Sequence, residues 1–305
     1  MLTPTFMAVG THAHVRHMSA DDVRETGASI MLGNTYHLML RPGVEVFRRF
    51  GDIHRFMDWD RPVLTDSGGF QIFSLPGDRV LTERGAHFRS YVDNSRQLLS
   101  PERSIEVQQA IGSDIMMVLD VCIDSTSDEA TTREAMERTH RWAMRSLAAR
   151  DAGDPTQALF AIVQGGVFPA LREESAAFLT QRPFDGFAIG GLAVGETRDE
   201  RESMTELAAA LLPANKPRYL MGVGTPIDLI EAVKRGVDMF DCIIPVKMAQ
   251  QGWVYTFDGQ LRIQRQEYRL SDDPLDRQCD CKACTTLSRG YIHHLLVAKH
   301  QLGWR

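Results

Sequence analysis

The hydrophobic positions of this chain fall into short runs that alternate with longer amphipathic segments. The runs have the length of β-strands and end at a glycine or a polar residue. They predict eight strands, at residues 6–9, 29–32, 63–64, 115–119, 159–163, 187–189, 219–221 and 239–240. The segments between them predict helices at residues 19–26, 101–111, 127–150, 170–180, 199–212 and 225–235. This alternation indicates an α/β fold, a (β/α)8 TIM barrel rather than an open doubly wound sheet.

Two segments fall outside the alternation. Residues 79–99 carry turn signals at Gly85 and Asn94, which predict a hairpin insertion after the third strand. Residues 256–305 follow the eighth unit. We therefore expect a catalytic barrel over residues 1–255 and a zinc-binding appendage over residues 256–305. We expect this appendage to be incomplete, with fewer zinc ligands than a structural site needs.

A cysteine cluster marks the appendage. Cys279, Cys281 and Cys284 fall within six positions, a spacing that suits thiolates on one zinc ion better than disulfides. A structural zinc site takes four ligands, and this cluster supplies three. No pattern of histidines and carboxylates predicts a catalytic metal at the strand ends.

Composition narrows the class of protein. No stretch reaches the roughly 18 consecutive apolar residues of a membrane span, and the N-terminus lacks a signal-peptide pattern. Unpaired Cys122 and Cys242 predict a reducing, cytoplasmic setting. A net charge of −6 argues mildly against a nucleic-acid partner. However, residues 262–305 hold eight Lys/Arg against five Asp/Glu. This basic segment can be an RNA-binding surface or an ordinary solvated surface, and composition does not decide between the two.

The residues that close the strands carry the candidate chemistry, because barrel enzymes place reacting groups at the C-terminal strand ends. They are Asn34, Asp66, Asp120, Gln164, Gly190, Gly191, Met221, Gly222 and Asp241. In glycosyl chemistry one carboxylate of a pair attacks or stabilises the anomeric carbon, and the other transfers protons to the leaving group or acceptor. Asp66 and Asp241 can supply such a pair. Asp120 and Gln164 have the donors and acceptors to read a base, and the N–H groups of Gly190 and Gly191 can hold a carbonyl oxygen. The set fits the edge of a guanine-like base.

Simpler roles stay open for several of these residues. Asp66 and Asp120 can each cap a following helix. Met221 and Cys122 can be buried core residues. Asp238 lies three positions before Asp241 and is a competing nucleophile, although the strand at residues 239–240 aims Asp241 better.

Seven motifs in order resemble the tRNA-guanine transglycosylases across nearly the whole chain. They are Leu-Gly-Asn-Thr-Tyr-His-Leu (32–38), Leu-Thr-Asp-Ser-Gly-Gly-Phe-Gln (64–71), Ile-Val-Gln-Gly-Gly (162–166), Ile-Gly-Gly-Leu-Ala-Val-Gly-Glu (189–196), Tyr-Leu-Met-Gly-Val-Gly (219–224), Asp-Met-Phe-Asp-Cys (238–242) and the cysteine cluster. The resemblance implies exchange of the wobble guanine of a tRNA anticodon for a 7-deazaguanine, a step in queuosine formation. It also implies a structural Zn²⁺ and a homodimer, with no membrane partner.

By this resemblance Asp241 attacks the ribose anomeric carbon and leaves a covalent enzyme–RNA intermediate, and Asp66 handles the proton when the new base enters. The residues that would bind the base are Asp66, Ser67, Gly68, Gly69, Phe70, Asp120, Cys122, Gln164, Gly190, Gly191, Leu192 and Met221, with Phe70 and Met221 on its two faces. The residues that would contact RNA are Gly222, Val223, Gly224, Thr225, Pro226, Ile227, Asp228, Val246, Lys247, Met248, Ala249 and Gln250.

The chain departs from the family pattern at two places in these motifs. Residues 246–250 read Val-Lys-Met-Ala-Gln where the family usually has Thr-Arg-x-x-Arg, which puts RNA affinity or tRNA choice in question because Arg and Lys differ at phosphate contacts. Val121 replaces a glutamate that is common in bacterial pockets. Because Cys122 and Val194 keep the bacterial pattern, 7-aminomethyl-7-deazaguanine is slightly favoured over queuine as the incoming base.

The two ends also depart. The chain opens almost directly on the first strand where the family has an additional hairpin, and the family's histidine ligand would fall about five residues beyond Arg305. His293 and His294 occur in the family and are not that ligand. Two alternatives therefore stay open: a catalytically weak or inactive tRNA-binding partner subunit or fragment, and a deazaguanine transglycosylase that acts on DNA.

Overall fold

The computed structural model describes residues 2–74, 79–153 and 156–305, and it divides into two compact units. The first unit comprises residues 1–14 and 28–242, and the second comprises residues 15–27 and 243–305. The sequence placed the boundary at 255/256, whereas the contacts divide the chain after Cys242 and assign residues 15–27 to the C-terminal unit.

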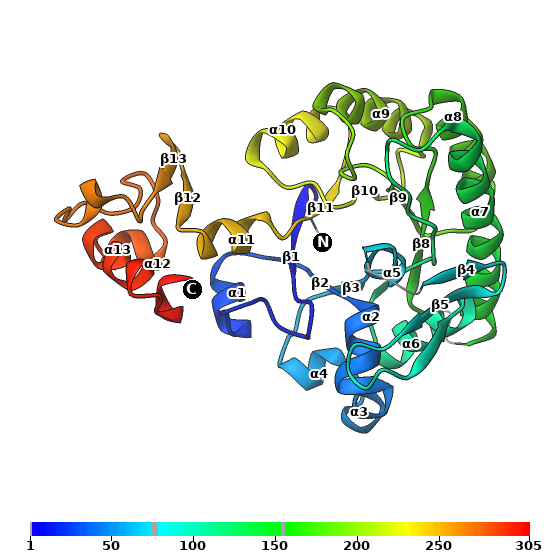
Figure 1. The fold of residues 1–305 in the computed structure, drawn as a ribbon, viewed down its shortest axis with the longest axis horizontal. Coiled ribbons are helices and arrows are strands. Elements are labelled where there is room, and N and C mark those ends of the chain that lie inside the picture. The colour runs from blue at the N-terminus through cyan, green and yellow to red at the C-terminus, as the bar shows by residue number, and fades with distance from the viewer. Residues whose placement is uncertain (1, 75–78, 154–155) are drawn as a thin grey trace. The chain divides into compact units, whose positions relative to one another are not determined.

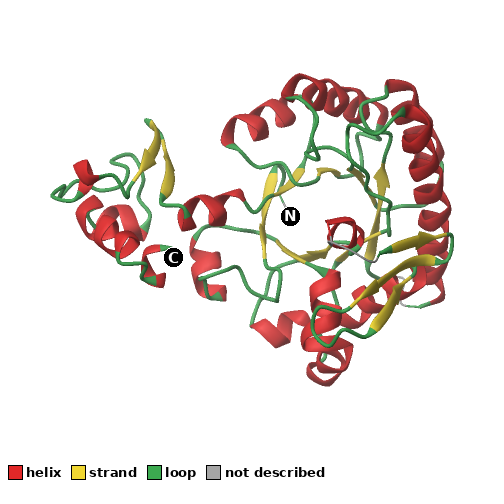
Figure 2. Ribbon diagram, in the orientation of Figure 1, coloured by secondary structure: helices red, strands yellow, loops and turns green. Residues whose placement is uncertain are grey.

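Eight parallel strands close into a barrel in the first unit, with helices around it (Figures 1 and 2). This confirms the predicted (β/α)8 fold. The strands run around the barrel in the order β1-β11-β10-β9-β8-β7-β3-β2. Their bounds are β1 (Thr5–Val9), β2 (Met31–Gly33), β3 (Val63–Thr65), β7 (Ile115–Met117), β8 (Ala158–Val163), β9 (Gly186–Ile189), β10 (Arg218–Leu220) and β11 (Met239–Asp241).

The main helices agree with the amphipathic segments to within about two residues, the usual uncertainty of helix ends. They are α6 (Pro101–Ile111), α7 (Glu129–Ala152), α8 (Pro169–Thr180), α9 (Arg198–Leu211) and α10 (Pro226–Lys234). Short polar residues cap the N-termini of four of them: Ser100, Asp128, Thr197 and Thr225 each accept a hydrogen bond from a backbone N–H of the first turn.

Residues between β2 and β7 contain elements that the hydrophobic pattern did not predict. Several short helices precede or follow β3: α2 (Thr35–Leu38), the π-helical turn η1 (Met39–Gly43), α3 (Val44–Phe50), α4 (Ile53–Met57) and α5 (Gly69–Ser74). The predicted hairpin at 79–99 is a three-stranded antiparallel sheet, β4 (Val80–Thr82), β5 (Gly85–Arg89) and β6 (Arg96–Leu99). Residues 75–78 lie outside the described part of the chain.

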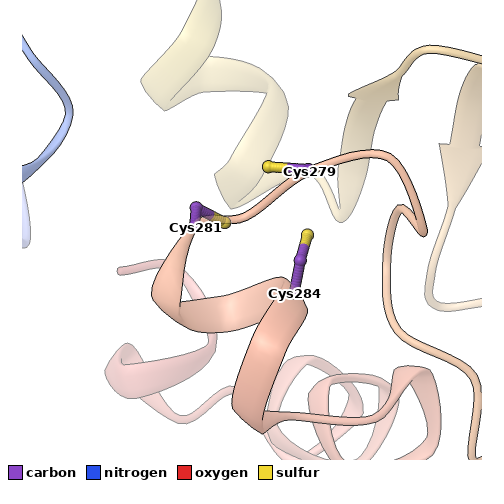
Figure 3. A group of neighbouring side chains, drawn as sticks. All are labelled: Cys279, Cys281 and Cys284. Atoms are coloured by element: carbon purple, nitrogen blue, oxygen red, sulfur yellow. The ribbon is translucent and has the colours of Figure 1, made fainter.

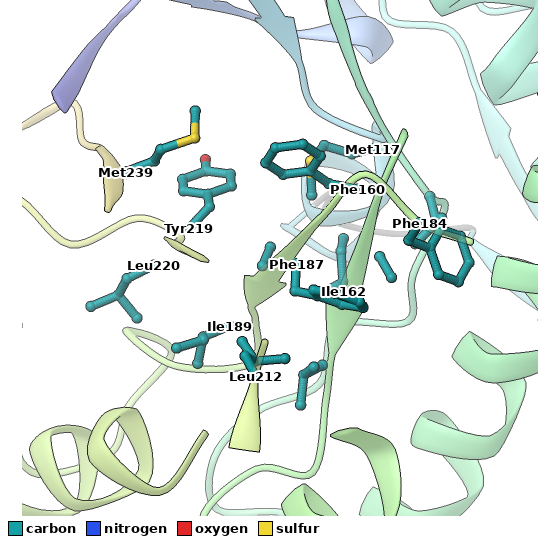
Figure 4. Close-up of a cluster of buried hydrophobic side chains, with 14 of the residues drawn as sticks. Met117, Phe160, Ile162, Phe184, Phe187, Ile189, Leu212, Tyr219, Leu220 and Met239 are labelled. Carbon is teal, nitrogen blue, oxygen red and sulfur yellow. The ribbon is translucent and has the colours of Figure 1, made fainter. Parts of the chain in front are cut away.

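The barrel core is packed with large apolar side chains, as Figure 4 shows for the region around β8, β9 and β10. Phe160 and Phe187 are at most 2% exposed. Gly186 makes room for this packing, since a Cβ there would lie 2.4 Å from the Phe160 ring. Burial of such a side chain contributes about 1.5–3 kcal/mol. The closed, filled barrel thus forms a rigid base for the residues at its strand ends.

The second unit has its own small core. Its elements are α1 (Ala20–Glu25), α11 (Ile244–Gln250), the hairpin β12 (Trp253–Thr256) and β13 (Gly259–Arg262), η2 (Gln266–Tyr268), α12 (Lys282–Thr286), α13 (Arg289–Val297) and η3 (Gln301–Gly303). Ile263, Leu275, Ile292 and Leu296 pack together in it. His293 is buried beside them and its Nδ1 lies 2.8 Å from the carbonyl oxygen of Ile263.

Over residues 2–74, 79–153 and 156–305, no helix combines the length and the apolar character needed to cross a membrane.

Candidate active site

The strand register brings the candidate residues of the barrel to one level. Val163, Ile189, Leu220 and Phe240 are aligned across β8, β9, β10 and β11. The next residues along these strands are therefore neighbours: Gln164, Gly190, Met221 and Asp241. On the other side of the barrel Gly33 is aligned with Thr65, so Asn34 and Asp66 are neighbours as well.

Asp66 is a buried carboxylate held by three donors. Its Oδ2 accepts hydrogen bonds from Asn34 Nδ2 at 2.5 Å and Gln71 Nε2 at 2.7 Å, and its Oδ1 accepts one from the backbone N–H of Thr35 at 2.8 Å. Burial raises the pKa of Asp66 to about 6, the three donors oppose this rise, and the negative charge of Asp241 adds to it. A carboxyl group with this pKa can take up and release a proton near neutral pH.

Asp241 is held differently, because both of its donors reach the same oxygen. Tyr219 Oη donates to Oδ1 at 2.6 Å, and the backbone N–H of Gly222 donates to Oδ1 at 2.8 Å. Burial raises the pKa of Asp241 and these two donors oppose the rise. The hydroxyl of Tyr219 is itself buried beside two carboxylates, so its pKa is raised and it stays a donor. Among the described residues no hydrogen bond to Oδ2 of Asp241 is seen, which makes this oxygen the candidate for reaction.

Asp120 and Gln164 are joined by a hydrogen bond. Gln164 directly follows β8, whereas Asp120 lies three residues after the end of β7, which is shorter than the expected strand at 115–119. Gln164 Nε2 donates to Asp120 Oδ2 at 2.8 Å, and Ser67 Oγ donates to Asp120 Oδ1 at 3.0 Å. Burial raises the pKa of Asp120, opposed by the same two donors. Asp120 is not a helix cap, since Asp128 caps α7. Gly69 lies so close that a Cβ there would stand 2.8 Å from Asp120 Oδ1.

The glycines after β9 lie against the Gln164 carboxamide. A Cβ on Gly191 would lie 2.3 Å from Gln164 Oε1, and one on Gly190 would lie 3.1 Å from Gln164 Nε2. Gly191 also has a φ of +63°, which favours glycine. The backbone here can therefore approach a ligand as closely as it approaches Gln164.

The remaining base-binding candidates differ in exposure. Phe70 on α5 is 51% exposed, so its ring is accessible for stacking on a ligand. Met221 is half-buried and packs against the barrel core. Cys122 and Leu192 are buried. Burial raises the pKa of the Cys122 thiol, and the nearby Asp120 adds to this, so the thiol stays protonated at neutral pH.

The cysteine cluster forms a separate candidate metal centre in the second unit. The sulfurs of Cys279, Cys281 and Cys284 point toward one another (Figure 3), and each sulfur lies within 4.8 Å of the other two. Cys281 is the N-cap of α12, and Cys284 lies on that helix, so a short loop and one helical turn bring the thiols together. Three thiols at this separation fit one ion that is bound by sulfur.

Comparison with known proteins decides which family this site belongs to. The sequence matches the family described as queuine tRNA-ribosyltransferase over residues 1–305. The chain belongs to this family. The protein named queuine tRNA-ribosyltransferase of Solidesulfovibrio magneticus is 51% identical over 303 residues, which are 99% of this chain and 81% of that protein. Those of Thioalkalivibrio sulfidiphilus and Shewanella denitrificans are 52% and 48% identical, with 99% of this chain and 81% and 80% of those proteins covered.

Two segments of this queuine tRNA-ribosyltransferase family member are candidates for RNA contact, and they lie in different units. In the barrel unit, residues 222–228 form the turn after β10 and the start of α10. Ile227 is 55% exposed there, whereas Asp228 pairs with Arg201 Nη2 at 3.1 Å. The exposed part of this segment is thus apolar, with its acid already paired.

Residues 246–250 lie on α11 of the second unit. Lys247 is exposed there. Gln250 is engaged within its own unit, because its Oε1 lies 3.5 Å from Arg16 Nη1 and its Nε2 lies 3.2 Å from His17 Nε2. Lys247 is therefore the cation of this segment that is left for a phosphate.

The sequence reasoning missed three residues that support the carboxylates. Asn34 was seen at a strand end but given no role, and Gln71 and Tyr219 were not singled out. The signal for Tyr219 was its position within a predicted buried strand, because a buried tyrosine hydroxyl needs a hydrogen-bond partner. Gln71 had no signal of this kind, since only the fold of α5 turns its amide toward Asp66.

Proposed function

We propose that this protein exchanges the wobble guanine of tRNA for a 7-deazaguanine base through a covalent intermediate on Asp241. The observation that carries the proposal is the pair of carboxylates at one barrel mouth, Asp241 with one oxygen left for attack and Asp66 with a pKa near 6. Membership in the queuine tRNA-ribosyltransferase family supports the same chemistry. The alternatives of an inactive partner subunit or a DNA-modifying enzyme are not favoured.

The chemistry proceeds in two displacements. Oδ2 of Asp241 attacks C1′ of the ribose, the C1′–N9 bond breaks, and its electron pair leaves with guanine, which then takes a proton from water. Asp66 accepts the N9 proton of the incoming base and returns it to water, while the base nitrogen attacks C1′ and releases Asp241. Each displacement has one nucleophile and one leaving group, so the overall reaction is an exchange without an added oxidant or reductant.

The base-binding roles follow from donors and acceptors. Asp120 accepts N–H groups from the base, and Gln164 holds Asp120 in place while its second amide atom faces Gly191. Phe70 and Met221 supply the two faces. The incoming base that we propose is 7-aminomethyl-7-deazaguanine, supported by Cys122 and Val194, which follow the bacterial pattern.

The experiment that tests this function measures the release of guanine from tRNA in the presence of different incoming bases. Wild-type protein is incubated with tRNA that carries labelled guanine at the wobble position, and release of label is followed with 7-aminomethyl-7-deazaguanine, queuine or no added base. Release that depends on an added deazaguanine, and on guanine rather than adenine at that tRNA position, is expected. Failure of every base to release the label would overturn the proposal, and preference for queuine would overturn only the choice of base.

We propose that the metal held by Cys279, Cys281 and Cys284 is a structural Zn²⁺. Three thiols are typical of zinc rather than of magnesium or calcium, which prefer oxygen. Zinc here would tie the loop before α12 to that helix and has no part in the exchange. The expected result is about one zinc per wild-type chain and a clear loss in Cys284→Ser. Cys242→Ser, which changes a buried cysteine of the barrel unit, is the control and should keep its zinc.

We propose a homodimer in a cytoplasmic setting as the form of the protein in the cell. All five cysteines are free thiols, which suits a reducing compartment. The dimer is supported by the family resemblance. Light scattering on the purified protein should give twice the 34.3 kDa chain mass, and a monomer at micromolar concentration would contradict it.

A further inference from the structure

Three aromatic side chains, His12, His37 and Tyr91, form a ring cluster at the surface of the barrel unit. The rings of His12 and His37 meet edge to face with their centroids 4.9 Å apart, and the ring of Tyr91 lies 5.7 Å from that of His37. Tyr91 Oη lies 3.3 Å from His37 Nδ1. The buried ring of Tyr36 lies 5.1 Å from His37 and 6.0 Å from Tyr91. The fold therefore joins rings from three separate segments and supports them from the core side.

The strand order places the ring cluster between the two carboxylates. Four neighbouring strands of the barrel follow one another as β11, β1, β2 and β3 (Figure 1). Asp241 ends β11 and Asp66 follows β3, whereas His12 comes after β1 and His37 lies on α2, directly after β2. Thr35, at the start of α2, donates its backbone N–H to Asp66. The rings thus lie at the strand ends on the arc that leads from Asp241 to Asp66.

This position suits a nucleotide next to the exchanged one. The ribose that Asp241 attacks continues into the RNA chain in two directions, and β11 has two neighbouring strands, β10 and β1. The turn after β10 carries the candidate RNA-contact segment 222–228. The turn after β1 carries His12, and the ring cluster extends from there to β2. One flanking nucleotide is therefore expected over residues 222–228, and the other over the ring cluster.

The rings of the cluster are accessible and uncharged. Tyr91 is 51% exposed, and His12 is exposed as well. Burial lowers the pKa of His37, and the neighbouring His12 adds to this. The pKa of His12 is also lowered, first by burial and then by the charges of His14 and Arg41. Both imidazoles are therefore neutral at pH 7. Aromatic rings of this kind stack on any unpaired base, because each base has a π face.

Two arginines beside the ring cluster suit the phosphates of the same RNA strand. Arg41 is exposed and lies close enough to His12 to influence its pKa. Arg89 is exposed at the end of β5, two residues before Tyr91, and its Nη1 donates to the carbonyl of Asn94 at 3.4 Å. Over the described ranges 2–74, 79–153 and 156–305 neither arginine takes part in an ion pair. Arginines without a carboxylate partner are available to phosphate oxygens.

We propose that the ring cluster of His12, His37 and Tyr91 binds, by stacking, an unpaired RNA base next to the exchanged guanine. The inference rests on the proposed function and deepens it, because it gives a second nucleotide of the tRNA a place on the enzyme. A base held here keeps the neighbouring ribose near Asp241 but takes no part in the displacement. Loss of the stack should therefore weaken RNA binding more than it slows the chemical step.

The test pairs changes in the protein with changes in the RNA. Tyr91→Ala removes an exposed ring, and Tyr91→Phe keeps the ring without its hydroxyl. Each variant is measured with three anticodon stem-loops: one intact, one abasic just before the exchanged guanine, and one abasic just after it. Fluorescence anisotropy gives the affinity, and denaturing gels give the rate of adduct formation at saturating stem-loop. Phe257→Ala is the matched control, since Phe257 is a 75% exposed ring on the β12–β13 turn of the second unit.

On the intact stem-loop Tyr91→Ala should bind roughly five- to hundred-fold more weakly, the scale of one base–aromatic stack. Tyr91→Phe and Phe257→Ala should bind nearly as tightly as wild type. One of the two abasic stem-loops should show a similar loss with wild-type protein, and on that stem-loop Tyr91→Ala should cause no further loss. His12→Ala should give the same pattern from a different segment of the cluster. The rate of adduct formation at saturating stem-loop should change little.

Equal losses from Tyr91→Ala on the intact stem-loop and on both abasic ones would overturn the inference, because no base would then depend on the ring. Wild-type affinity of folded Tyr91→Ala for the intact stem-loop would overturn it as well. If Tyr91→Ala does not fold, His12→Ala decides the same comparison. Wild-type protein that binds the intact stem-loop and forms no adduct would instead overturn the proposed function, while the affinities would still test the ring cluster.

Discussion

The two carboxylates at the barrel mouth share burial and differ in how their oxygens are held. Asp66 has donors on both oxygens, from Asn34, Thr35 and Gln71, whereas Asp241 has its two donors, Tyr219 and Gly222, on Oδ1 alone. A nucleophile needs one oxygen that is not committed, and a proton acceptor needs a pKa near the working pH. The hydrogen-bond pattern, more than burial, distinguishes the two carboxylates and supports the different roles that we propose for them.

Asp241→Asn is the change with the largest expected effect on this comparison. The carboxamide is a poor nucleophile, so the covalent RNA adduct should disappear and base exchange should fall by at least about 10⁴-fold, the scale on which a nucleophile in a catalytic set acts. Denaturing gel electrophoresis of enzyme with labelled stem-loop measures the adduct. The control is Asp238→Asn, three residues earlier, where the carboxylate accepts a hydrogen bond from the backbone N–H of Arg218. An adduct that persists in Asp241→Asn and is lost in Asp238→Asn would reverse the assignment.

Asp66→Asn should slow a different step. Without a proton acceptor the incoming base reacts poorly, so exchange should fall by roughly 10²–10⁴-fold, the usual contribution of a general base. The adduct with Asp241 should still form and should accumulate. Single-turnover measurement of the two half-reactions checks this, and equal slowing of both would mean that Asp66 supports binding rather than proton transfer.

The same variant gives a stability test with a defined sign. The folded-state pKa of Asp66 is about 6, above its ordinary 3.8. Folded protein therefore holds this proton more tightly than unfolded protein, and stability falls as the pH rises from about 3.8 to about 6. This loss is about 3 kcal/mol at pH 7 and vanishes below pH 3.8. The melting temperature of Asp66→Asn relative to wild type should rise between pH 4 and pH 7, and a difference that does not change with pH would contradict the raised pKa.

Tyr219→Phe should have the smallest effect and the most specific one. The hydroxyl of Tyr219 opposes the rise in the pKa of Asp241, so its removal should raise that pKa further. The acid limb of the pH profile for adduct formation should then move to higher pH. At neutral pH the rate should fall by about tenfold or less, since one hydrogen bond to a charged group contributes about 1.5–3 kcal/mol, spread over ground and transition states. An unmoved acid limb would mean that another group sets it.

The sequence predicted the barrel because each strand is a short apolar run and each main helix is an amphipathic segment between two such runs. It also predicted that the polar residues at the strand ends lie together, and the register brings Gln164, Gly190, Met221 and Asp241 to one level. The short helices between β2 and β3 were not predictable by period, since each is too short to show one. The sequence did not predict the hydrogen bonds that Asn34, Gln71 and Tyr219 donate to the carboxylates. These bonds depend on which carboxylate lies next to each side chain in the folded chain.

The proposed covalent intermediate on Asp241 has a stereochemical consequence. In this proposal Oδ2 of Asp241, whose Oδ1 accepts from Tyr219 and Gly222, attacks C1′ of the ribose from the face opposite the departing guanine. Departure of guanine and entry of the new base must then both occur on the opposite face, each with inversion at C1′. Two inversions restore the β-configuration of the nucleoside, so the modified tRNA keeps the geometry of a normal anticodon. In the proposed mechanism the outgoing and incoming bases occupy the same position beside Asp120, so guanine should compete with the deazaguanine for it.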